Sequence, residues 1–241
     1  MKSNFYVTGD IHGHYDIARI WHWANKTSFN KKTYLIITGD FGLIFYGKYA
    51  KKYYELELPN IERLNSMPFT TLFVDGNHEN FDRLNNQEEF PRIHWNGGEA
   101  TRIMENIFHL RRGQVFNIDG LKFFTLGGAL SLDKHLRKPH ISWWQEERLS
   151  NVEINCAFEN LEKHNNEVDY VITHAAPRYF AKQIFDYQNL PFYSHDNTEI
   201  ELEEILKDVK YKHWYCGHYH YDYSFGRNTA LYEEILQLGE K

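Results

Sequence analysis

The sequence contains little cysteine and no long apolar run. Its 241 residues include two cysteines, Cys156 and Cys216, which are too few for a disulfide framework and favour a reducing compartment. No apolar run approaches the ~20 residues that span a bilayer. Met1 is followed almost at once by the apolar residues 5–7, without the basic and apolar regions of a signal peptide. We therefore expect a cytoplasmic protein with no membrane segment.

The sequence also lacks an excess of positive charge. Its formal net charge is −6 with neutral histidines, which argues against binding to nucleic acid by charge alone. The stretch from Arg102 to Arg148 is an exception, because it holds eight lysines and arginines against five acids. A local basic face for a polyanionic substrate is therefore a hypothesis for this stretch.

Strand-like and helix-like segments alternate over the first 75 residues. Apolar runs at 4–8, 34–38 and 70–75 predict buried strands. Ile17, Ile20, Trp21 and Ala24 fall on one face of a helix after the first strand, and a second helix is predicted within 48–66. This order predicts an α/β fold, with a parallel sheet covered by helices.

The middle of the chain changes to an antiparallel pattern. Residues 114–118 and 121–126 resemble two strands, and Asp119-Gly120 between them is a strong hairpin signal. A helix is expected over 152–164, followed by strands at 169–173 and 212–216. With no repeat or linker, we predict a single domain over 1–241, in which an antiparallel insertion at about 100–140 contributes to the substrate face.

Five of the expected strands end in side chains that can bind a metal. Glycine stands just before the candidate ligand in most of these blocks and allows a tight turn there. Since ligands bind outside the carboxyl ends of strands in open α/β sheets, we expect these groups to share one cleft. Each block alone could be an ordinary turn, and the joint occurrence carries the argument. The candidates are Asp10, His12, Asp40, Asn77, His174, His218 and His220.

The types of these residues indicate the kind of ion. Two carboxylates, one amide and four imidazoles suit Mn²⁺, Fe²⁺ or Zn²⁺. One ion could not use seven such ligands and keep a reactive position open, whereas two ions that share a bridging carboxylate could. We therefore expect two divalent metal ions as cofactors, with Mn²⁺ preferred. Such a pair clamps the attacking and leaving oxygens of a phosphoryl displacement.

The blocks Asp10-Ile11-His12, Gly39-Asp40, Gly76-Asn77-His78-Glu79, His174 and Gly217-His218-Tyr219-His220 resemble the calcineurin-like metallophosphoesterase superfamily. The resemblance implies a metallophosphoesterase-type β-sandwich flanked by helices on both sides. It also implies that Asp10, His12 and His220 hold the first metal, and that Asn77, His174 and His218 hold the second. Asp40 would bridge the two metals, and His78 would face the substrate.

One block departs from the protein serine/threonine phosphatases of this superfamily. Those enzymes continue the second block to Asp-Arg-Gly, whereas here Asp40 is followed by Phe41-Gly42-Leu43. The absence of that arginine argues against protein phosphatase activity. Lys134 and Arg137 could supply the missing positive charge, since both residue types bind phosphate. We predict that they contact the substrate together with Asn77.

The hypothesis from the sequence is a hydrolase of phosphate esters that uses a metal-bridging hydroxide, with His78 and Asp40 as catalytic residues. A phosphodiester is favoured over a phosphomonoester, and the expected partner is a substrate such as a nucleotide or a nucleic-acid end. No membrane or obligatory protein partner is expected. Two alternatives remain: a nuclease or phosphatase that processes nucleic-acid ends, and a non-catalytic scaffold of the same fold.

Overall fold

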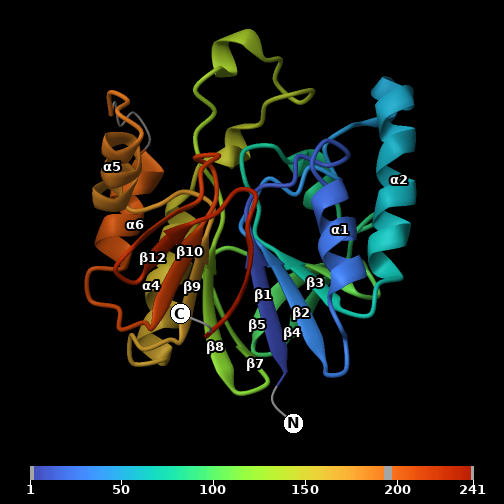
Figure 1. Ribbon diagram of the computed structural model, residues 1–241. Coiled ribbons are helices and arrows are strands. Elements are labelled where there is room, and N and C mark those ends of the chain that lie inside the picture. Colours follow the sequence, from blue (N-terminus) through green and yellow to red (C-terminus); the bar gives the residue numbers. More distant parts are fainter. Residues whose placement is uncertain (1–2, 193–196, 240–241) are drawn as a thin grey trace.

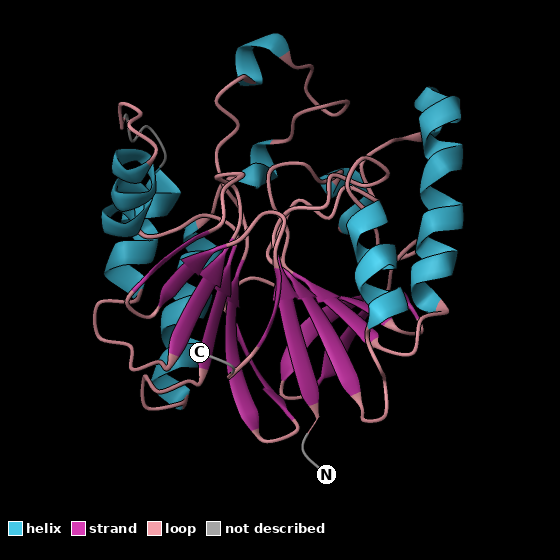
Figure 2. Ribbon diagram, viewed as in Figure 1, coloured by secondary structure: helices cyan, strands magenta, loops and turns pink. Residues whose placement is uncertain are grey.

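Two mixed β-sheets pack face to face, and helices cover their outer sides. The computed structural model describes residues 3–192 and 197–239. Figures 1 and 2 show α1 and α2 beside one sheet and α4, α5 and α6 beside the other. The predicted α/β sandwich with helices on both sides is confirmed.

The first sheet has the strand order β13-β1-β2-β3-β6-β5-β4. Strands β1, β2, β3 and β6 run parallel. Strand β13 pairs antiparallel with β1, β5 pairs antiparallel with β6, and β4 pairs antiparallel with β5 at the edge of the sheet. All five residues of β2 are buried, as expected for a central strand covered on both faces. The bounds of the strands and of the helices linked to this sheet are β1 (Asn4–Thr8), α1 (Ala18–Lys26), β2 (Thr33–Ile37), the 3₁₀ helix η1 (Lys48–Ala50), α2 (Lys51–Asn65), β3 (Thr70–Phe73), α3 (Phe81–Leu84), β4 (Arg92–Trp95), β5 (Gly98–Met104), β6 (Ile107–Leu110) and β13 (Ile235–Gln237).

The second sheet has the strand order β11-β12-β10-β9-β8-β7. Its central strands β8, β9, β10 and β12 run parallel. Several elements have no counterpart among those predicted from the sequence. Helix α5 beside this sheet and strand β13 of the first sheet are two examples. The bounds are β7 (Gln114–Ile118), β8 (Leu121–Leu126), the 3₁₀ helices η2 (Lys134–Leu136) and η3 (Gln145–Glu147), α4 (Asn151–Lys163), β9 (Tyr170–Thr173), α5 (Arg178–Tyr187), α6 (Asn197–Ile205), β10 (His213–Cys216), β11 (Tyr223–Phe225) and β12 (Asn228–Ala230).

The core between the sheets is rich in aromatic rings. Phe5 of β1 stacks on Tyr34 of β2 and also contacts Phe123 of β8, with ring centroids 4.8 and 5.1 Å apart. Phe123 in turn stacks on Tyr170 of β9. Rings of this size bury a large apolar area each, so a few of them fill the space between two sheets. The two sheets are thereby fixed relative to one another, which matters because the candidate site draws residues from both.

The predicted hairpin forms between β7 and β8. Asp119 and Gly120 both have positive φ, 50° and 88°, as a tight turn of this kind requires. The strands between 92 and 126 pair antiparallel in part, but β6 also pairs parallel with β3, and β8 with β9. These strands are therefore continuous with both sheets, and the segment between β8 and α4 is the part that lies outside them. Its role at the substrate face stays a prediction.

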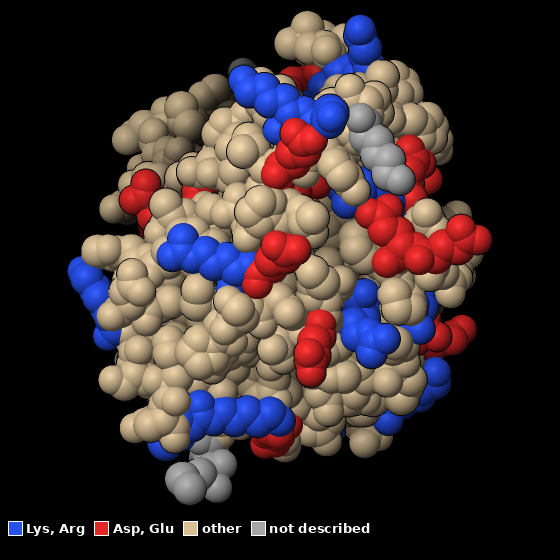
Figure 3. All heavy atoms as spheres, turned by 90° about the vertical axis from the view of Figure 1, so that its right-hand side faces the viewer, with Lys and Arg blue, Asp and Glu red and all other residues tan. Residues whose placement is uncertain are grey.

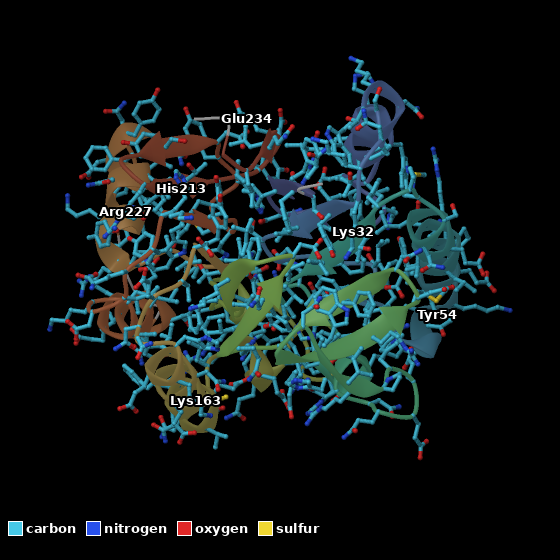
Figure 4. All side chains as sticks on the ribbon, turned by 90° about the horizontal axis from the view of Figure 1, so that it is seen from below. Lys32, Tyr54, Lys163, His213, Arg227 and Glu234 are labelled. Atoms are coloured by element: carbon cyan, nitrogen blue, oxygen red, sulfur yellow. The ribbon has the colours of Figure 1, made fainter. Side chains whose placement is uncertain are left out.

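The two ends of the sandwich differ. The loops after β1, β2, β3, β9 and β10 meet at the upper end in Figure 1, where the segment between β8 and α4 rises above them. Figure 4 shows the opposite end, with Lys32 and His213 at the starts of β2 and β10. There Lys32 and Tyr34 contact the Asp119 carboxylate at 3.2 Å each, which links the two sheets.

The outer surface beside α1 and α2 carries mixed charge. Figure 3 shows basic and acidic side chains intermingled on this face. Among the described residues, no helix is both long enough and apolar enough to cross a bilayer.

Candidate metal centre

The predicted metal ligands come from the loops at the carboxyl ends of five strands. Asp10 follows β1 and Asp40 follows β2, which are parallel neighbours in the first sheet. His174 directly follows β9, and His218 and His220 follow its parallel neighbour β10 in the second sheet. Because the two sheets face each other, these loops approach from opposite sides and enclose one cluster of side chains.

Four of these residues form a compact group of metal-binding atoms. One ligand atom each from Asp10, His12, Asp40 and His220 lies within 4.8 Å of all the others. His12 Nε2 is 3.4 Å from Asp40 Oδ2, and His220 Nε2 is 3.2 Å from Asp10 Oδ2. Both carboxylates are buried, at 0% and 1% exposure. Buried carboxylates beside imidazoles form a donor set that fits a divalent ion.

The remaining predicted ligands lie against the other side of Asp40. His174 Nε2 is 3.4 Å from Asp40 Oδ1 and 3.1 Å from Asn77 Oδ1. The His218 ring lies edge-on to the His174 ring, with centroids 5.0 Å apart. Asp40 therefore stands between two groups of donors, as expected for a carboxylate shared by two ions. The assignment of ligands to individual ions stays a prediction.

The backbone of the ligand loops is strained at the ligands themselves. His12, Asp40, His218 and His220 have φ values of 47°, 45°, 70° and 49°, in the left-handed region that non-glycine residues rarely adopt. Such strain persists only where the surrounding structure enforces it, and it concentrates at functional sites.

Two glycines are required by close approach. A Cβ at Gly76 would overlap the Asp40 carboxylate, and a Cβ at Gly217 would overlap the Asp10 carboxylate. The glycine before a ligand in one loop therefore makes room for the ligand of a neighbouring loop.

The electrostatics of the cluster call for positive charge. Burial alone would lower the pKa of His174, but Asp40 and Asp10 outweigh it and raise that pKa to about 10. Burial likewise opposes a charged His12, but Asp40 and Asp10 raise its pKa to about 9. The pKa of Asp40 is held well below its ordinary value, because His174 and the other imidazoles outweigh its burial. Metal ions would replace these protons, since imidazole must be neutral to coordinate.

His78 and Arg137 meet above the cluster. The backbone N–H of His78 donates to Asp40 Oδ1 at 2.7 Å. The His78 ring lies edge-on to the His12 ring, with centroids 5.4 Å apart. Arg137 Nη2 lies 3.1 Å from His78 Nε2. Asp133 holds the same guanidinium at 2.8 Å. The predicted substrate residue Arg137 is thus brought to His78.

Lys134 and Asn77 lie differently from Arg137. Lys134 lines a separate cavity on the far side of the loop that follows β3. Asn77 Nδ2 donates to Ser131 Oγ at 3.2 Å, while its Oδ1 faces His174. The structure therefore brings Asn77 and Arg137 to the metal-binding cluster and places Lys134 apart from it.

Sequence reasoning missed an aromatic cavity beside the cluster. It has a volume of about 460 Å³ and is lined by Tyr15, Phe45, Tyr46 and Tyr232 as well as His78. Tyr232 stacks on the His220 ring, with centroids 4.8 Å apart. Aromatic residues are frequent along this chain, so nothing in the local sequence separated these four from residues of the core.

Fold and site together define a metal-binding α/β sandwich whose donors gather at the carboxyl ends of parallel strands. The sequence matches the calcineurin-like phosphoesterase family over residues 3–222, and the chain belongs to that family. The family consists of hydrolases that act on phosphate esters. The family predicted from the sequence is thereby confirmed.

Curated relatives of the chain are lariat debranching enzymes. The Schizosaccharomyces pombe enzyme is 25% identical over 237 residues, which cover 89% of this chain and 47% of the relative. The Entamoeba histolytica enzyme is 24% identical, over 98% of this chain and 69% of the relative. The Drosophila melanogaster enzyme is 26% identical, over 70% of this chain and 30% of the relative. The chain thus spans about half the length of the first of these relatives.

Proposed function

We propose that the chain is a phosphodiesterase that uses two divalent metal ions, with Mn²⁺ preferred. The observation that carries this proposal is the cluster of Asp10, His12, Asp40 and His220, with His78 directly above it. Asp10, His12 and His220 would hold one ion, and Asn77, His174 and His218 the other. Asp40 would be shared, because its two oxygens face different imidazoles.

The metals would supply the chemistry that side chains of this kind lack. When bound, divalent ions polarise a phosphoryl oxygen and lower the pKa of water, so that attack proceeds at neutral pH. The chain must then hold the substrate and manage the proton of the leaving oxygen.

Arg137 and His78 are placed for these two tasks. A guanidinium can only donate hydrogen bonds, so His78 Nε2 accepts from Arg137 and the neutral ring carries its proton on Nδ1. Burial and the nearby Arg137 lower the pKa of His78, although Asp40 opposes them, which favours this neutral form. A phosphate that takes over the Arg137 N–H groups would free His78 Nε2 and place a negative charge beside it, so that Nε2 could take up a proton from solvent and pass that proton to the leaving oxygen.

The aromatic cavity favours a diester. A phosphodiester carries a second organic group, and this group needs space beside the metals. The cavity lined by Tyr15, Phe45, Tyr46 and Tyr232 offers about 460 Å³ next to His12 and His78. Aromatic side chains stack on nucleobases of any sequence. The relatives are named lariat debranching enzymes, and that name points to a branched substrate. A diester with a nucleoside on at least one side is the proposed substrate class.

A comparison of two chromogenic substrates tests the proposal. The protein is stripped of metal, restored with Mn²⁺, and assayed with bis(p-nitrophenyl) phosphate and with p-nitrophenyl phosphate. We expect turnover to depend on the metal and to be faster for the diester. Asp40→Asn should abolish it, because one carboxylate serves both groups of donors. Asp208→Asn is the matched control, because Asp208 is exposed and lies outside the site.

Each other outcome points to a different function. A faster monoester reaction would contradict the diester proposal and favour a phosphatase for a small molecule or a nucleic-acid end. Metal binding without turnover of either ester would favour the non-catalytic scaffold. Equal activity of Asp40→Asn and Asp208→Asn would remove the metal centre from the mechanism.

A further inference from the structure

A second cavity lies on the other side of the loop that follows β3. It has a volume of about 800 Å³, which is the size of a pocket for a small ligand. Its walls come from the ends of β3 and β6, from α3, from the segment between β8 and α4, and from the start of α4. Asp75 lines this cavity, whereas Asn77, two residues further on, faces His174 of the metal-binding cluster. We call this space the cationic cavity.

Positive side chains outnumber the negative ones in its lining. Two of the three carboxylates, Asp75 and Glu153, are already bound to Arg112, at 2.5 and 3.2 Å. The third carboxylate, that of Glu146, is exposed. Among the described residues, no carboxylate lies within 4.0 Å of the cationic groups of the four remaining basic residues. These are Arg92, Arg111, Lys134 and Arg148.

Arg111 is the clearest case of a guanidinium without a directly paired carboxylate. Its Nη1 makes only two long contacts, 3.4 Å each, with the neutral side chains of Asn85 and Thr101. Burial lowers the pKa of Arg111 and the like charge of Arg92 lowers it further, although the more distant carboxylates of Asp75, Glu153 and Glu99 oppose them. Two guanidiniums that repel each other in a shared cavity would be stabilised by an anion between them, because an anion pairs with both.

Two buried polar atoms of the lining also lack partners in the described part of the chain. His109 is 3% exposed, and its Nε2 lies 2.9 Å from Asp75 Oδ1, while its Nδ1 has no hydrogen-bond partner. The indole Nε1 of Trp143 likewise has none. Burial lowers the pKa of His109, and the neutral ring then donates from Nε2 to Asp75. Its Nδ1 is left as an acceptor, whereas the Trp143 N–H is a donor. Both atoms are buried within the wall, so a ligand could reach them only if the lining moved.

We propose that the cationic cavity is a second ligand site, which binds a phosphate monoester of mononucleotide size. Arg92 and Arg111 would hold the phosphate. Lys134 and Arg148 lie in the same lining and add to its positive charge. Phe81 and Leu84 give the same cavity apolar walls against which a base or sugar would lie. This proposal does not depend on the reaction at the metal centre.

The positive charge of the cavity is a local property. On the face beside α1 and α2, basic and acidic side chains alternate (Figure 3). The whole chain has a net charge of −6. Arg92, Lys134 and Arg148 are exposed and Arg111 is half-buried, so the positive charge of the lining is open to an anion from solvent.

Calorimetry with adenosine 5′-monophosphate tests the proposal. The protein is titrated both with Mn²⁺ present and with a chelator present. We expect a binding event that persists in the chelator and that weakens at least 10-fold in Arg111→Gln and in Arg92→Gln. Arg102→Gln is the matched control, because Arg102 lies on β5 next to Thr101, the partner of Arg92, and so points to the opposite face of the sheet. Its affinity should equal that of the wild type.

The chelator arm separates this site from the metal centre. Asp40→Asn should leave the chelator-resistant binding unchanged, even if it abolishes turnover. Titration with a 5′-phosphorylated oligonucleotide distinguishes two sources of the same chemistry. Tighter binding of the mononucleotide assigns the site to a free nucleotide, and tighter binding of the oligonucleotide assigns it to the end of a strand.

Three results would overturn the proposal. The first is that neither adenosine 5′-monophosphate nor the 5′-phosphorylated oligonucleotide binds at millimolar concentration when the chelator is present. The second is an equal affinity of Arg111→Gln and Arg102→Gln. The third is equal binding of adenosine and adenosine 5′-monophosphate, since the guanidiniums would then contribute nothing. Thermal melting of each variant, compared with the wild type, shows whether a lost affinity reflects the cavity or a loss of folded protein.

Discussion

The loop after β3 separates two regions of opposite charge. On one side, buried Asp10 and Asp40 are surrounded by imidazoles whose pKa values they raise. On the other side, Arg92 and Arg111 stand without a carboxylate in the described chain, and the one buried ion pair is Asp75 with Arg112. The first region needs cations and the second needs an anion, although only a few residues divide them.

The comparison also separates structural from functional charges. Asp75 is satisfied within the protein, because Arg112 Nε and Nη2 and His109 Nε2 all contact its carboxylate within 2.9 Å. Asp40 accepts one short hydrogen bond, 2.7 Å from the His78 backbone N–H, and otherwise faces imidazoles at 3.4 Å, which is longer than a good hydrogen bond. A carboxylate that is fully paired stabilises the fold, whereas one that is surrounded by donors at longer distance leaves room for an ion. The substitutions that follow test this difference.

Asp75→Ala should have the largest effect, and the effect should be on stability. The change leaves Arg112 buried with only Glu153 as a partner, and breaking a buried ion pair costs about 3–5 kcal/mol. We expect the free energy of unfolding in urea to fall by that amount. Asp186→Ala is the control, because its pair with Lys182 is exposed and is worth roughly 0.5 kcal/mol or less. Equal losses in the two variants would show that Arg112 finds another partner.

His78→Ala should have the next largest effect, on rate and not on stability. Loss of a group that handles a proton at the leaving oxygen lowers kcat about 10²–10³-fold, or roughly 3–4 kcal/mol. The urea midpoint should stay near that of the wild type. His22→Ala, on the exposed face of α1, serves as the control and should leave kcat unchanged. A loss of metal content in His78→Ala would instead make His78 a ligand.

Arg137→Gln and Lys134→Gln compare the two regions directly. The two residues are three positions apart in the sequence, yet Arg137 lies at the metal-binding cluster and Lys134 lines the cationic cavity. We expect Arg137→Gln to raise KM for a diester about 10-fold, which corresponds to ~1.4 kcal/mol. Lys134→Gln should change it less than about twofold. Steady-state kinetics with the chromogenic diester measure both. If Lys134→Gln raised KM more than Arg137→Gln, Lys134 would be a substrate-binding residue, as the sequence predicted.

The sequence predicts the strand-end cluster well because each ligand is local to its own strand. Asp10, Asp40 and His174 follow apolar runs that are recognisable from a few residues each, and parallel strands bring such ends together. The hairpin at Asp119-Gly120 is similarly local, because its turn needs two residues with positive φ. Patterns that are complete within about ten residues are therefore the ones that the sequence reveals.

The two cavities could not be predicted because their linings are assembled from distant segments. Tyr15, Phe45 and Tyr232 meet only through tertiary packing, and no spacing rule joins them. The local excess of positive charge did point toward Arg111 and Arg112. It could not show that Arg112 is buried against Asp75 while Arg111 is not paired with any described carboxylate. Strand β13 was missed for the same reason, since it is short and pairs with β1 at the other end of the chain.

A pH-dependent effect is expected in the segment between β8 and α4, which forms the wall between the two regions. Glu147 is fully buried in the segment that also holds Ser131, the partner of Asn77. Burial raises the pKa of Glu147 to about 7, although hydrogen bonds from Ser131 and Trp144 oppose it. The folded protein therefore keeps this proton up to about pH 7, whereas the unfolded chain releases it near 4.5. Stability from this group is full below pH 4.5 and declines as the pH rises to 7.

Glu147→Gln mimics the protonated acid at every pH. We expect the variant and the wild type to have similar unfolding free energies near pH 4.5, and the variant to be more stable by up to about 3 kcal/mol at pH 8. Other titrating groups cancel in the difference between the two proteins, so urea titrations of both across this range isolate Glu147. A difference that does not change with pH would mean that Glu147 keeps its charge in the folded state. The wall would then hold a buried negative charge between the imidazoles of the metal-binding cluster and the guanidiniums of the cationic cavity.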